Sequence, residues 1–372
     1  MAKVATHEAC RFMQDCLLSV GANSLAAEQQ SRLLLQADIY GHPSHGMNRI
    51  EMYVNEIKQG VCMPNDKPKI LKQSVCTAWI DANNVLGATV SHFAMDVAIN
   101  KAKETGVGWV TVKGSNHNGI AAYWAQLAAN FGYIGLAFTN SCPFVAPTRS
   151  KKAVLGTNPI CLVAPASNGE FFHLDMATSA AAFGKIEMEL RKGNPQIPRG
   201  WAQGVDGRMT LDTKEANEVR RLFPLGGEEI TSGFKGFGLC AMVELLCGVC
   251  SGSKYSHHIR PWSHDGNNGP ADLGQCFIVV NPNCFAPCFG ERLTDCLESW
   301  RKLPRVDPNL PVLAPGDKEK MAAAIVEKTG YITYLQQQID SCNALAQVLK
   351  ISPIQVLNDD CNTPCGMKEK PE

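Results

Sequence analysis

Short apolar runs alternate with polar, glycine-containing breaks through residues 106–165 of the chain. The runs at 107–112, 134–138 and 160–163 have the length of buried strands, and an alanine-rich segment with helical spacing lies at 120–131. This alternation predicts a βα unit that enters a buried sheet. Small polar residues and one histidine, His117, stand where the runs end, and strand ends are where open α/β sheets bind ligands.

Helical patterns dominate both ends of the chain. Apolar residues recur there with the spacing that places them on one face of a helix. We expect helices at 6–20, 24–38 and 46–59, and again at 317–329 and 334–349.

The two helical ends suggest a domain division, since chain termini often lie close together. We expect a helical domain of residues 1–70 plus 310–360, an α/β domain of 71–309 for cofactor and substrate, and a loose tail at 361–372. Residues 256–274 are polar and rich in glycine and proline, which predicts an excursion over the surface.

Composition narrows the class of protein. The 372 residues carry 35 basic and 35 acidic side chains. The chain therefore lacks the excess of basic residues that would predict binding to nucleic acid. No stretch approaches the roughly 18 consecutive apolar residues that a membrane helix needs. Glu8 and Asp15 interrupt the first 20 residues, so we expect no signal peptide and a cytoplasmic protein.

Sixteen cysteines are a high count. In a long chain without an expected signal peptide they are typical of reduced, buried thiols rather than disulfides. Cys247 and Cys250 have metal-like spacing, with His257 and His258 nearby, but no second cysteine pair lies at a matching distance. We therefore expect core cysteines and no metal.

A Gly-x-Gly-x-x-Ala sequence at 236–241 resembles the dinucleotide fingerprint in letters only. No good strand precedes it, and no acidic residue ends a second strand about 20 positions later. A nucleotide, if one binds, is therefore not expected at a Rossmann site.

Several motifs, in order, resemble those of the malate/L-lactate/L-sulfolactate dehydrogenase family. DIYGHPSHGMNRIEMY at 38–53 resembles its Ser-His-Gly motif, and SNHNG at 115–119 its Asn-His-x-Gly motif. The similarity covers about residues 5–355. The further matches are TNS at 139–141, LGTNP at 155–159, LDMATS at 174–179, IPRGWA at 197–202, LGG at 225–227 with KG at 235–236, and PGD at 315–317.

The resemblance implies an α/β fold peculiar to the family, in which a mixed sheet is covered by helices and the topology is not that of a Rossmann fold. It also implies a homodimer with the active site between domains. The reaction implied is hydride transfer between a nicotinamide cofactor and C2 of a 2-hydroxy acid.

Two histidines compete for the proton-transfer role in that reaction. A histidine suits it because its ordinary pKa is near 6.5. Some family members are described with a serine–histidine relay at the positions of Ser44 and His45, and others assign proton acceptance to the position of His117. A loop histidine taken alone is more often a capping or solvated residue, so the motifs carry this prediction, and both histidines stay open.

Two cations are candidates for the substrate anion. Arg49 lies four residues beyond His45 and would project near the loop from a helix that starts near Gly46, where its planar fork suits a carboxylate. Lys185 stands where the cyclic-imine reductase branch of the family carries aspartate. That difference favours a hydroxy-acid dehydrogenase with Lys185 near the substrate; for both residues the alternative is an exposed helix position.

The resemblance also marks cofactor contacts. Strand-end Asn, Ser and Asp side chains can bond ribose or carboxamide, and a lysine at a helix N-terminus can bind pyrophosphate, although turn and cap chemistry is the alternative for each. The candidate residues are His117, Asn118, Gly119, Asn140, Ser141, Asp175, Met176, Ala177, Lys235 and Gly316.

The bases at 149–152 could hold the 2′-phosphate of NADP or form a solvated turn. We expect NAD, with NADP as the alternative. The expected substrate pair is malate and oxaloacetate. The alternatives are lactate, sulfolactate or ureidoglycolate dehydrogenase activity, or a family member without turnover that acts as a binding protein.

Overall fold

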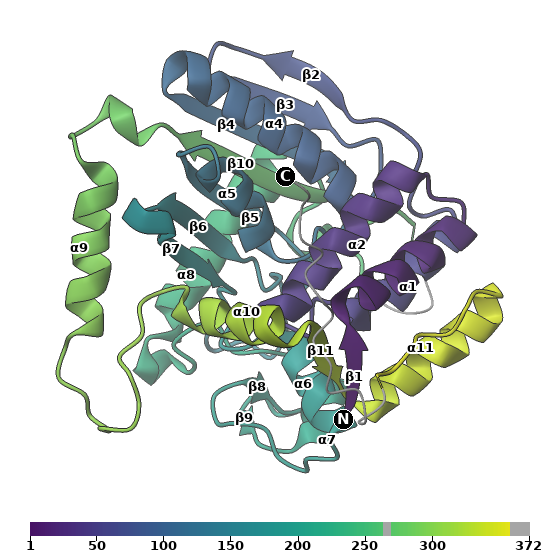
Figure 1. Cartoon of the computed structure of the whole chain (residues 1–372). Coiled ribbons are helices and arrows are strands. Elements are labelled where there is room, and N and C mark those ends of the chain that lie inside the picture. Colours follow the sequence, from purple (N-terminus) through teal and green to yellow (C-terminus); the bar gives the residue numbers. More distant parts are fainter. Residues whose placement is uncertain (263–268, 358–372) are drawn as a thin grey trace, which may run out of the picture.

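The computed structural model describes residues 1–262 and 269–357. A seven-stranded sheet lies at its centre in the order β2-β3-β4-β10-β5-β6-β7 (Figure 1). The sheet is mixed, because β3 and β4 pair in parallel while the other neighbouring pairs are antiparallel. The predicted mixed α/β fold is thus confirmed. The strands are β2 (Lys69–Gln73), β3 (Thr77–Asp81), β4 (Val107–Ser115), β5 (Ile134–Thr139), β6 (Ile160–Pro165), β7 (Phe171–Met176) and β10 (Leu273–Val280).

Strand β10 separates β4 and β5, although it follows β5 by more than 130 residues. It is apolar on both faces, as a central strand must be, and pairs antiparallel with both neighbours. Leu273 pairs with Ser115 and Gln275 with Thr139, so the C-terminal ends of β4 and β5 meet at one edge of the sheet. The loops that follow β4 and β5 therefore start side by side.

Helices α4 (Gly87–Thr105) and α5 (Ala121–Ala129) pack closely on the sheet. Glycine permits this approach, because a Cβ atom on Gly108 of β4 would lie 2.0 Å from the Ala98 carbonyl oxygen. The Trp124 side chain is fully buried in the same core, where removing an aromatic side chain typically costs about 3–5 kcal/mol.

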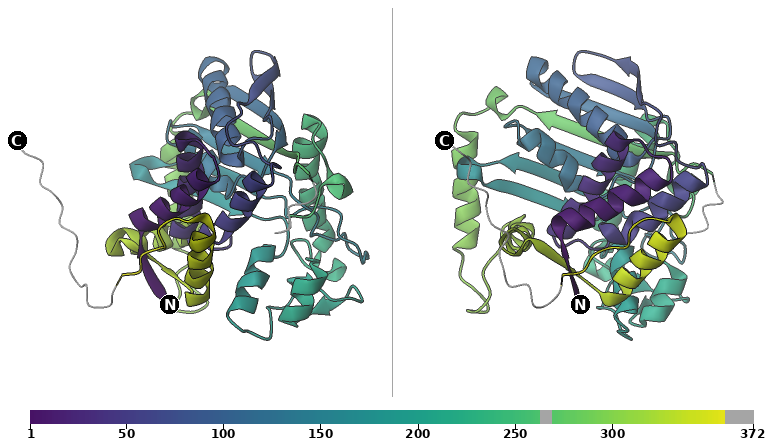
Figure 2. Two further views of the ribbon diagram at one scale, coloured as in Figure 1. Left: turned by 90° about the vertical axis from the view of Figure 1, so that its right-hand side faces the viewer. Right: turned by 45° about the vertical axis from the view of Figure 1, so that its right-hand side comes forward.

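The N-terminal elements and the last described elements, β11 and α11, lie together in space (Figures 1 and 2). Strand β1 (Ala2–Ala5) pairs antiparallel with β11 (Tyr331–Tyr334). A second core forms between the terminal helices, and α2 joins it to the first, since Leu34 packs in the second core and Leu33 in the first. The terminal helices are α1 (Thr6–Ser19), α2 (Ser24–Ile39), α3 (Ile50–Lys58) and α11 (Gln336–Leu349).

The division into a helical domain (1–70 plus 310–360) and an α/β domain (71–309) stays a prediction. The predicted tail at 361–372 lies outside the described residues. Where a helix was expected from residue 46, the chain first makes a 3-10 turn, Met47–Arg49, and α3 begins at Ile50. In the described part of the chain, no helix combines the length and apolarity needed to span a membrane.

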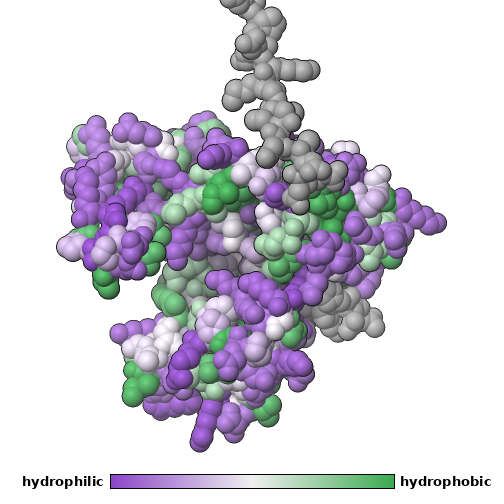
Figure 3. Space-filling view, turned by 60° about the horizontal axis from the view of Figure 1, so that its bottom comes forward, coloured by the Kyte–Doolittle hydropathy of each residue, from purple (hydrophilic) through white to green (hydrophobic). Residues whose placement is uncertain are grey.

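A smaller lobe with its own core lies below the sheet (Figures 1 and 2). In the space-filling view, the surface is hollowed between a larger body and a smaller lobe (Figure 3). The elements of the smaller lobe are α6 (Phe183–Arg191), β8 (Ala202–Gln203), β9 (Met209–Thr210) and α7 (Thr213–Val219). Beside it, α8 (Gly233–Glu244) continues as a π-helical turn, Leu245–Val249.

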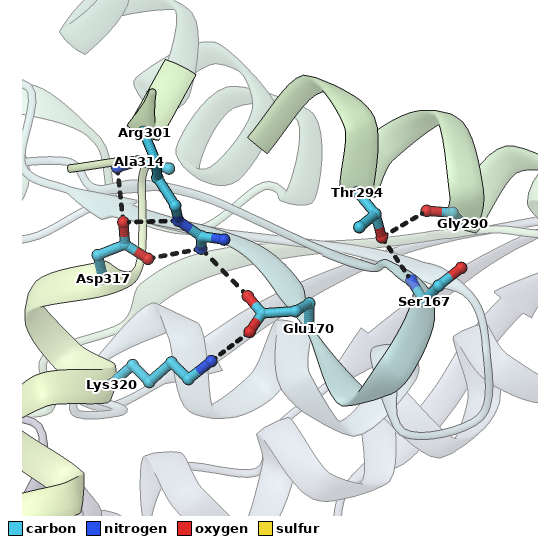
Figure 4. A network of polar contacts seen from close by, with 8 residues as sticks. All are labelled: Ser167, Glu170, Gly290, Thr294, Arg301, Ala314, Asp317 and Lys320. Atoms are coloured by element: carbon cyan, nitrogen blue, oxygen red, sulfur yellow. Dashed lines mark hydrogen bonds and ion pairs between the residues drawn. The ribbon is translucent and has the colours of Figure 1, made fainter. Parts of the chain in front are cut away.

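Helices α9 (Phe289–Arg301) and α10 (Asp317–Thr329) are tied to the sheet by an ion network (Figure 4). Arg301 donates to Asp317 at 2.6 and 3.0 Å and to Glu170 at 3.1 Å. Lys320 pairs with the other oxygen of Glu170. The network fixes the N-terminus of α10 close to the edge strand β7.

Candidate active site

His45 and His117 face one cavity of about 430 Å³, although they come from distant parts of the chain. His45 lies in the loop after α2, and His117 follows the C-terminal end of β4. Their ring centroids are 5.9 Å apart, with 25° between the ring planes. Trp262 stacks on His117 at 4.3 Å. The cavity has the size of a small-molecule site.

The His45 loop is fixed by a buried carboxylate. Asp38, at the end of α2, accepts hydrogen bonds from the Met47 N–H at 2.9 Å and the Tyr334 hydroxyl at 2.8 Å. A Cβ atom on Gly46 would lie only 1.9 Å from Asp38 Oδ1, so this loop requires glycine there. Burial raises the pKa of Asp38 to about 7, against the opposing effect of its two donors. Because Tyr334 lies on β11, the C-terminal part of the chain helps to position His45.

His45 is held as a neutral imidazole. Its Nδ1 lies 2.9 Å from the Ser44 hydroxyl. Burial, followed by the positive charge of Arg49, lowers the pKa of His45 to about 3. The ring is therefore unprotonated at neutral pH, with one nitrogen available as an acceptor, and Ser44 can orient it.

The hydrogen bonds of His117 define its tautomer. The Gly119 N–H, which can only donate, lies 3.3 Å from Nδ1, and the Tyr53 hydroxyl lies 2.6 Å from the same atom. Nδ1 is therefore an acceptor, and the neutral ring carries its proton on Nε2. Burial, reinforced by the positive charge of Arg49, holds the pKa of His117 well below its ordinary value. His117 thus offers an N–H donor from Nε2.

Arg49 lines the same cavity with part of its guanidinium engaged. Its Nε donates to the Ser44 carbonyl at 2.7 Å, and one Nη donates to Glu187 at 2.7 Å. Among the residues that the structure describes, the other Nη contacts only the Met52 sulfur, at 3.5 Å. A Cβ atom on Gly184 would lie 2.6 Å from the guanidinium, so α6 needs glycine there to admit the arginine.

Lys185 is not among the residues that line this cavity. Its side chain is exposed on α6, in a neighbouring groove that it shares with His42 and Ser44. Its charge contributes, as a minor cause, to the lowered pKa of His45. Lys185 thus occupies an exposed helix position, which was the alternative to a place near the substrate.

Sequence reasoning missed Arg220 and Trp262, which line the cavity, and the buried Tyr53, which contacts His117 from behind. Tyr53 lies inside the first family motif, and its spacing of four from Arg49 could have placed it near the site. Arg220 follows a short helix that the sequence did not predict. Trp262 corrects the expectation for residues 256–274: this segment is not only a surface excursion, because Trp262 stacks on His117.

The candidate cofactor residues of β4 and β5 differ in what their side chains do. Ser141 lines the cavity. Asn118 is buried, and its Oδ1 has no hydrogen-bond partner in the described residues, while Gly119 has a φ of 71°. Asn140 instead uses its whole amide inside the fold, toward Glu244 at 3.1 Å, the Lys254 carbonyl at 3.0 Å and the Gly274 N–H at 2.9 Å.

The remaining candidates lie around β7 and on two helices. Asp175 accepts from the Ala122 N–H at 2.7 Å, at the N-terminus of α5, and burial raises its pKa to about 6. Met176 and Ala177 follow it and are half-buried. Gly316 has a φ of 100° and packs on His173, so that its Cβ would lie 2.7 Å from the histidine Cβ. Lys235 is exposed on the first turn of α8.

The bases of residues 149–152 stand apart from the histidines. The exposed Arg149 forms an ion pair with Glu229, in a surface pocket that Asp206 and Glu228 also line. Cys247 is buried in the π-helical turn while Cys250 is exposed, and within residues 1–262 and 269–357 no group of three His, Cys, Asp or Glu could hold a metal.

A neutral histidine pair, an arginine and a stacked tryptophan thus line one cavity. The family model of malate/L-lactate dehydrogenase matches residues 4–342. The chain therefore belongs to this family, as the motifs indicated, and is an oxidoreductase of the 2-hydroxy-acid dehydrogenase class.

Relatives of known function agree with this assignment. Malate dehydrogenase of Pyrococcus abyssi is 34% identical over 357 residues, covering 95% of this chain and 97% of the relative. L-sulfolactate dehydrogenase of Methanocaldococcus jannaschii is 35% identical over 315 residues, covering 83% and 87%. The crystal structure of malate dehydrogenase from Entamoeba histolytica superposes with a TM-score of 0.88 at 30% identity, covering 94% of this chain and 98% of that one.

Proposed function

We propose that this protein is an NAD(P)-dependent 2-hydroxy-acid dehydrogenase whose substrate pair is malate and oxaloacetate. The observation that carries the proposal is the pair of neutral histidines beside Arg49 in one cavity. The names of the Pyrococcus relatives, malate dehydrogenases at 34% and 38% identity, favour malate. Relatives named for sulfolactate and ureidoglycolate are 35% and 30% identical, and supply the alternatives together with lactate.

The two histidines would divide the work at the substrate C2 oxygen. In oxidation, His45 accepts the hydroxyl proton at Nε2, in the neutral tautomer whose Nδ1–H donates to the Ser44 hydroxyl. Ser44 holds the ring through Nδ1. His117 donates from Nε2–H to the same oxygen and stabilises the negative charge that develops there.

Arg49 would hold the C1 carboxylate. Its Nη that touches only the Met52 sulfur is the group with donors to spare. Trp262 stacks on His117 and lies 5.8 Å from the Arg49 guanidinium, so it excludes water from both. Water exclusion strengthens the charge–charge contacts made inside the cavity.

The residues at the strand ends fit a dinucleotide. The unpartnered Oδ1 of Asn118 is a buried acceptor, and the half-buried carboxylate of Asp175 is a second one, for amide or ribose donors. The bound nicotinamide supplies the hydride acceptor for the substrate C2. We propose NAD over NADP, because Arg149 is already paired with Glu229, in a surface pocket that does not include the histidines.

We also propose a cytoplasmic homodimer. An exposed apolar row on α8 and the turn after it supports a protein contact there: Phe234, Met242, Leu245 and Val249. A family member without turnover remains the alternative class of function.

The test is oxidation of NADH and NADPH, side by side, with oxaloacetate, pyruvate and sulfopyruvate. Rapid NADH oxidation with oxaloacetate is the expected result. Faster turnover of pyruvate or sulfopyruvate would replace malate by the corresponding acid. Cofactor binding without turnover of any acid would leave the binding-protein alternative.

A further inference from the structure

Arg220 is a second arginine that lines the cavity of His45, His117 and Arg49. It follows α7 directly, and its backbone φ of 54° lies in the left-handed region that favours glycine. A non-glycine residue there is strained, which the surrounding structure must offset. The sequence therefore keeps a long cationic side chain where glycine would fit the backbone better.

The Arg220 guanidinium rests on an aromatic wall. Its central carbon lies 4.8 Å from the ring centroid of Phe183 and 5.3 Å from that of Phe144. The two rings stack on each other at 4.8 Å, nearly parallel. Cation–π contact of this kind holds a guanidinium by its flat face and leaves its N–H edge for a ligand.

Arg220 has no anion of its own in the described residues. Its Nε is buried without a hydrogen-bond partner, and no Asp or Glu in residues 1–262 and 269–357 forms an ion pair with it. Arg49, by contrast, pairs with Glu187. The adjacent Arg221 is also satisfied, by the Lys151 and Gly204 carbonyls. A half-buried, unpaired cation is costly, so the fold alone does not account for Arg220.

We propose that Arg220 determines substrate specificity by binding a second anionic group, carried on the carbon chain beyond C2. This rests on the proposed function and narrows its substrate class to dicarboxylates or sulfo-acids over monocarboxylates. Arg49 takes the C1 carboxylate, and Arg220 takes the distal carboxylate or sulfonate. Because Arg220 shares a single cavity with both histidines and Arg49, we assign its anion to the reacting acid, and the KM for NADH measured in the test below separates this from a contact with a cofactor phosphate.

The test compares kcat/KM for oxaloacetate, sulfopyruvate and pyruvate in the wild type, Arg220→Gly and Arg220→Lys. Loss of a charge-assisted contact should lower the ratio of kcat/KM for the preferred two-anion acid over pyruvate by about 10- to 100-fold in Arg220→Gly. Arg220→Lys should retain part of the ratio. Which of oxaloacetate and sulfopyruvate loses more identifies the distal group.

Glycine also separates binding from a structural role, because it relieves the left-handed backbone. We expect Arg220→Gly to melt within a few degrees of the wild type. Arg208→Met is the matched control: Arg208 is an exposed arginine in the nearby β8–β9 turn, and its loss should leave the ratio unchanged. An unchanged ratio in Arg220→Gly, or a raised KM for NADH with equal losses for all three acids, would overturn the proposal.

Absence of turnover in the wild type would defeat the proposed function but not this inference. Binding then decides, through the shift in melting temperature that malate and lactate produce with NAD⁺ present. A shift given by malate, larger than that of lactate and lost in Arg220→Gly, supports the subsite. No preference for malate in the wild type, or an equal preference in the variant, overturns it.

Discussion

His45 and His117 meet in one cavity but are held by different parts of the molecule. The His45 loop is anchored by Asp38 and by Tyr334 from the C-terminal strand β11. His117 is set by the end of β4 in the central sheet, by Tyr53 and by the stacked Trp262. Nδ1 of His45 faces the rotatable Ser44 hydroxyl, which can donate or accept a hydrogen bond. Nδ1 of His117 faces the Gly119 N–H, so it can only accept.

This difference teaches how two chemically identical side chains can take opposite roles. A backbone N–H cannot reverse its direction, so Gly119 fixes the His117 proton on Nε2. The Ser44 hydroxyl can adapt to either state of His45. A ring that must gain and lose a proton needs the adaptable partner, and a ring that only donates can have the fixed one.

Replacing each histidine by glutamine should reveal the largest difference in kcat/KM between the two residues. Glutamine can donate a hydrogen bond but cannot accept a proton, so His45→Gln should lower kcat/KM for the hydroxy acid by about 10²- to 10⁴-fold. His117→Gln should lose only about tenfold. Steady-state kinetics in both directions measure the effect, and the reverse order of losses would exchange the two roles.

The pH profile of oxidation sharpens the assignment. A histidine base with a pKa of 6.5 would lose about 30-fold in its neutral form between pH 7.5 and pH 5. Because burial lowers the pKa of His45 to about 3, we expect kcat/KM with a monocarboxylic 2-hydroxy acid to change less than about threefold over that range. A fall with a midpoint near pH 6.5 would contradict the buried, neutral ring.

The same lowered pKa acts on stability with a definite sign. Below pH 6.5 the unfolded state binds a proton at residue 45 that the folded state refuses, so stability is lost as the pH falls toward about 3. His45→Gln should therefore flatten the melting temperature between pH 6.5 and pH 5. Burial also lowers the pKa of His117, so this residue likewise reduces the stability of the folded state as the pH falls.

Tyr53→Phe should have a smaller effect on the other histidine. The hydroxyl 2.6 Å from Nδ1 is lost, while the Gly119 N–H still favours the Nε2 proton. We expect a loss of about 1 kcal/mol in the free energy of unfolding and a fall in kcat/KM of less than about tenfold. NMR of the His117 imidazole would show which ring nitrogen carries the proton. In the comparison variant Trp262→Ala, Nδ1 should still act as an acceptor. A tautomer change in Trp262→Ala, without one in Tyr53→Phe, would show that stacking by Trp262, and not the Tyr53 hydroxyl, determines the tautomer of His117.

Much of the fold could be predicted from local patterns. The β4–α5–β5 succession has strand-length apolar runs and a helical run between them, so its elements follow from residues close in the chain. The insertion of β10 between β4 and β5 could not, because strand pairing over such a distance leaves no local signal. The four-residue strands β1 and β11 are likewise too short to show a period of two.

The site residues also divide into those that local sequence could predict and those that it could not. His45, His117 and Arg49 lie within contiguous motifs, which made them recognisable. Arg220 and Trp262 reach the cavity through tertiary packing, from a short helix and from a segment that reads as polar loop. Asn140 shows the opposite limit, since a strand-end amide suited to a ligand spends all its hydrogen bonds inside the protein.

Lys185 provides the smallest expected effect and the last test of the His45 side of the cavity. The sequence placed it near the substrate, but its side chain is exposed in the groove beside Ser44 and reaches His45 only through its charge. Solvent screens such a charge, so Lys185→Met should change kcat/KM by less than about threefold, without a preference among acids. Lys192→Met, which removes another lysine from the same groove, is the control. A much larger loss that raises KM for the acid would place Lys185 on the substrate, and would make the groove part of the active site.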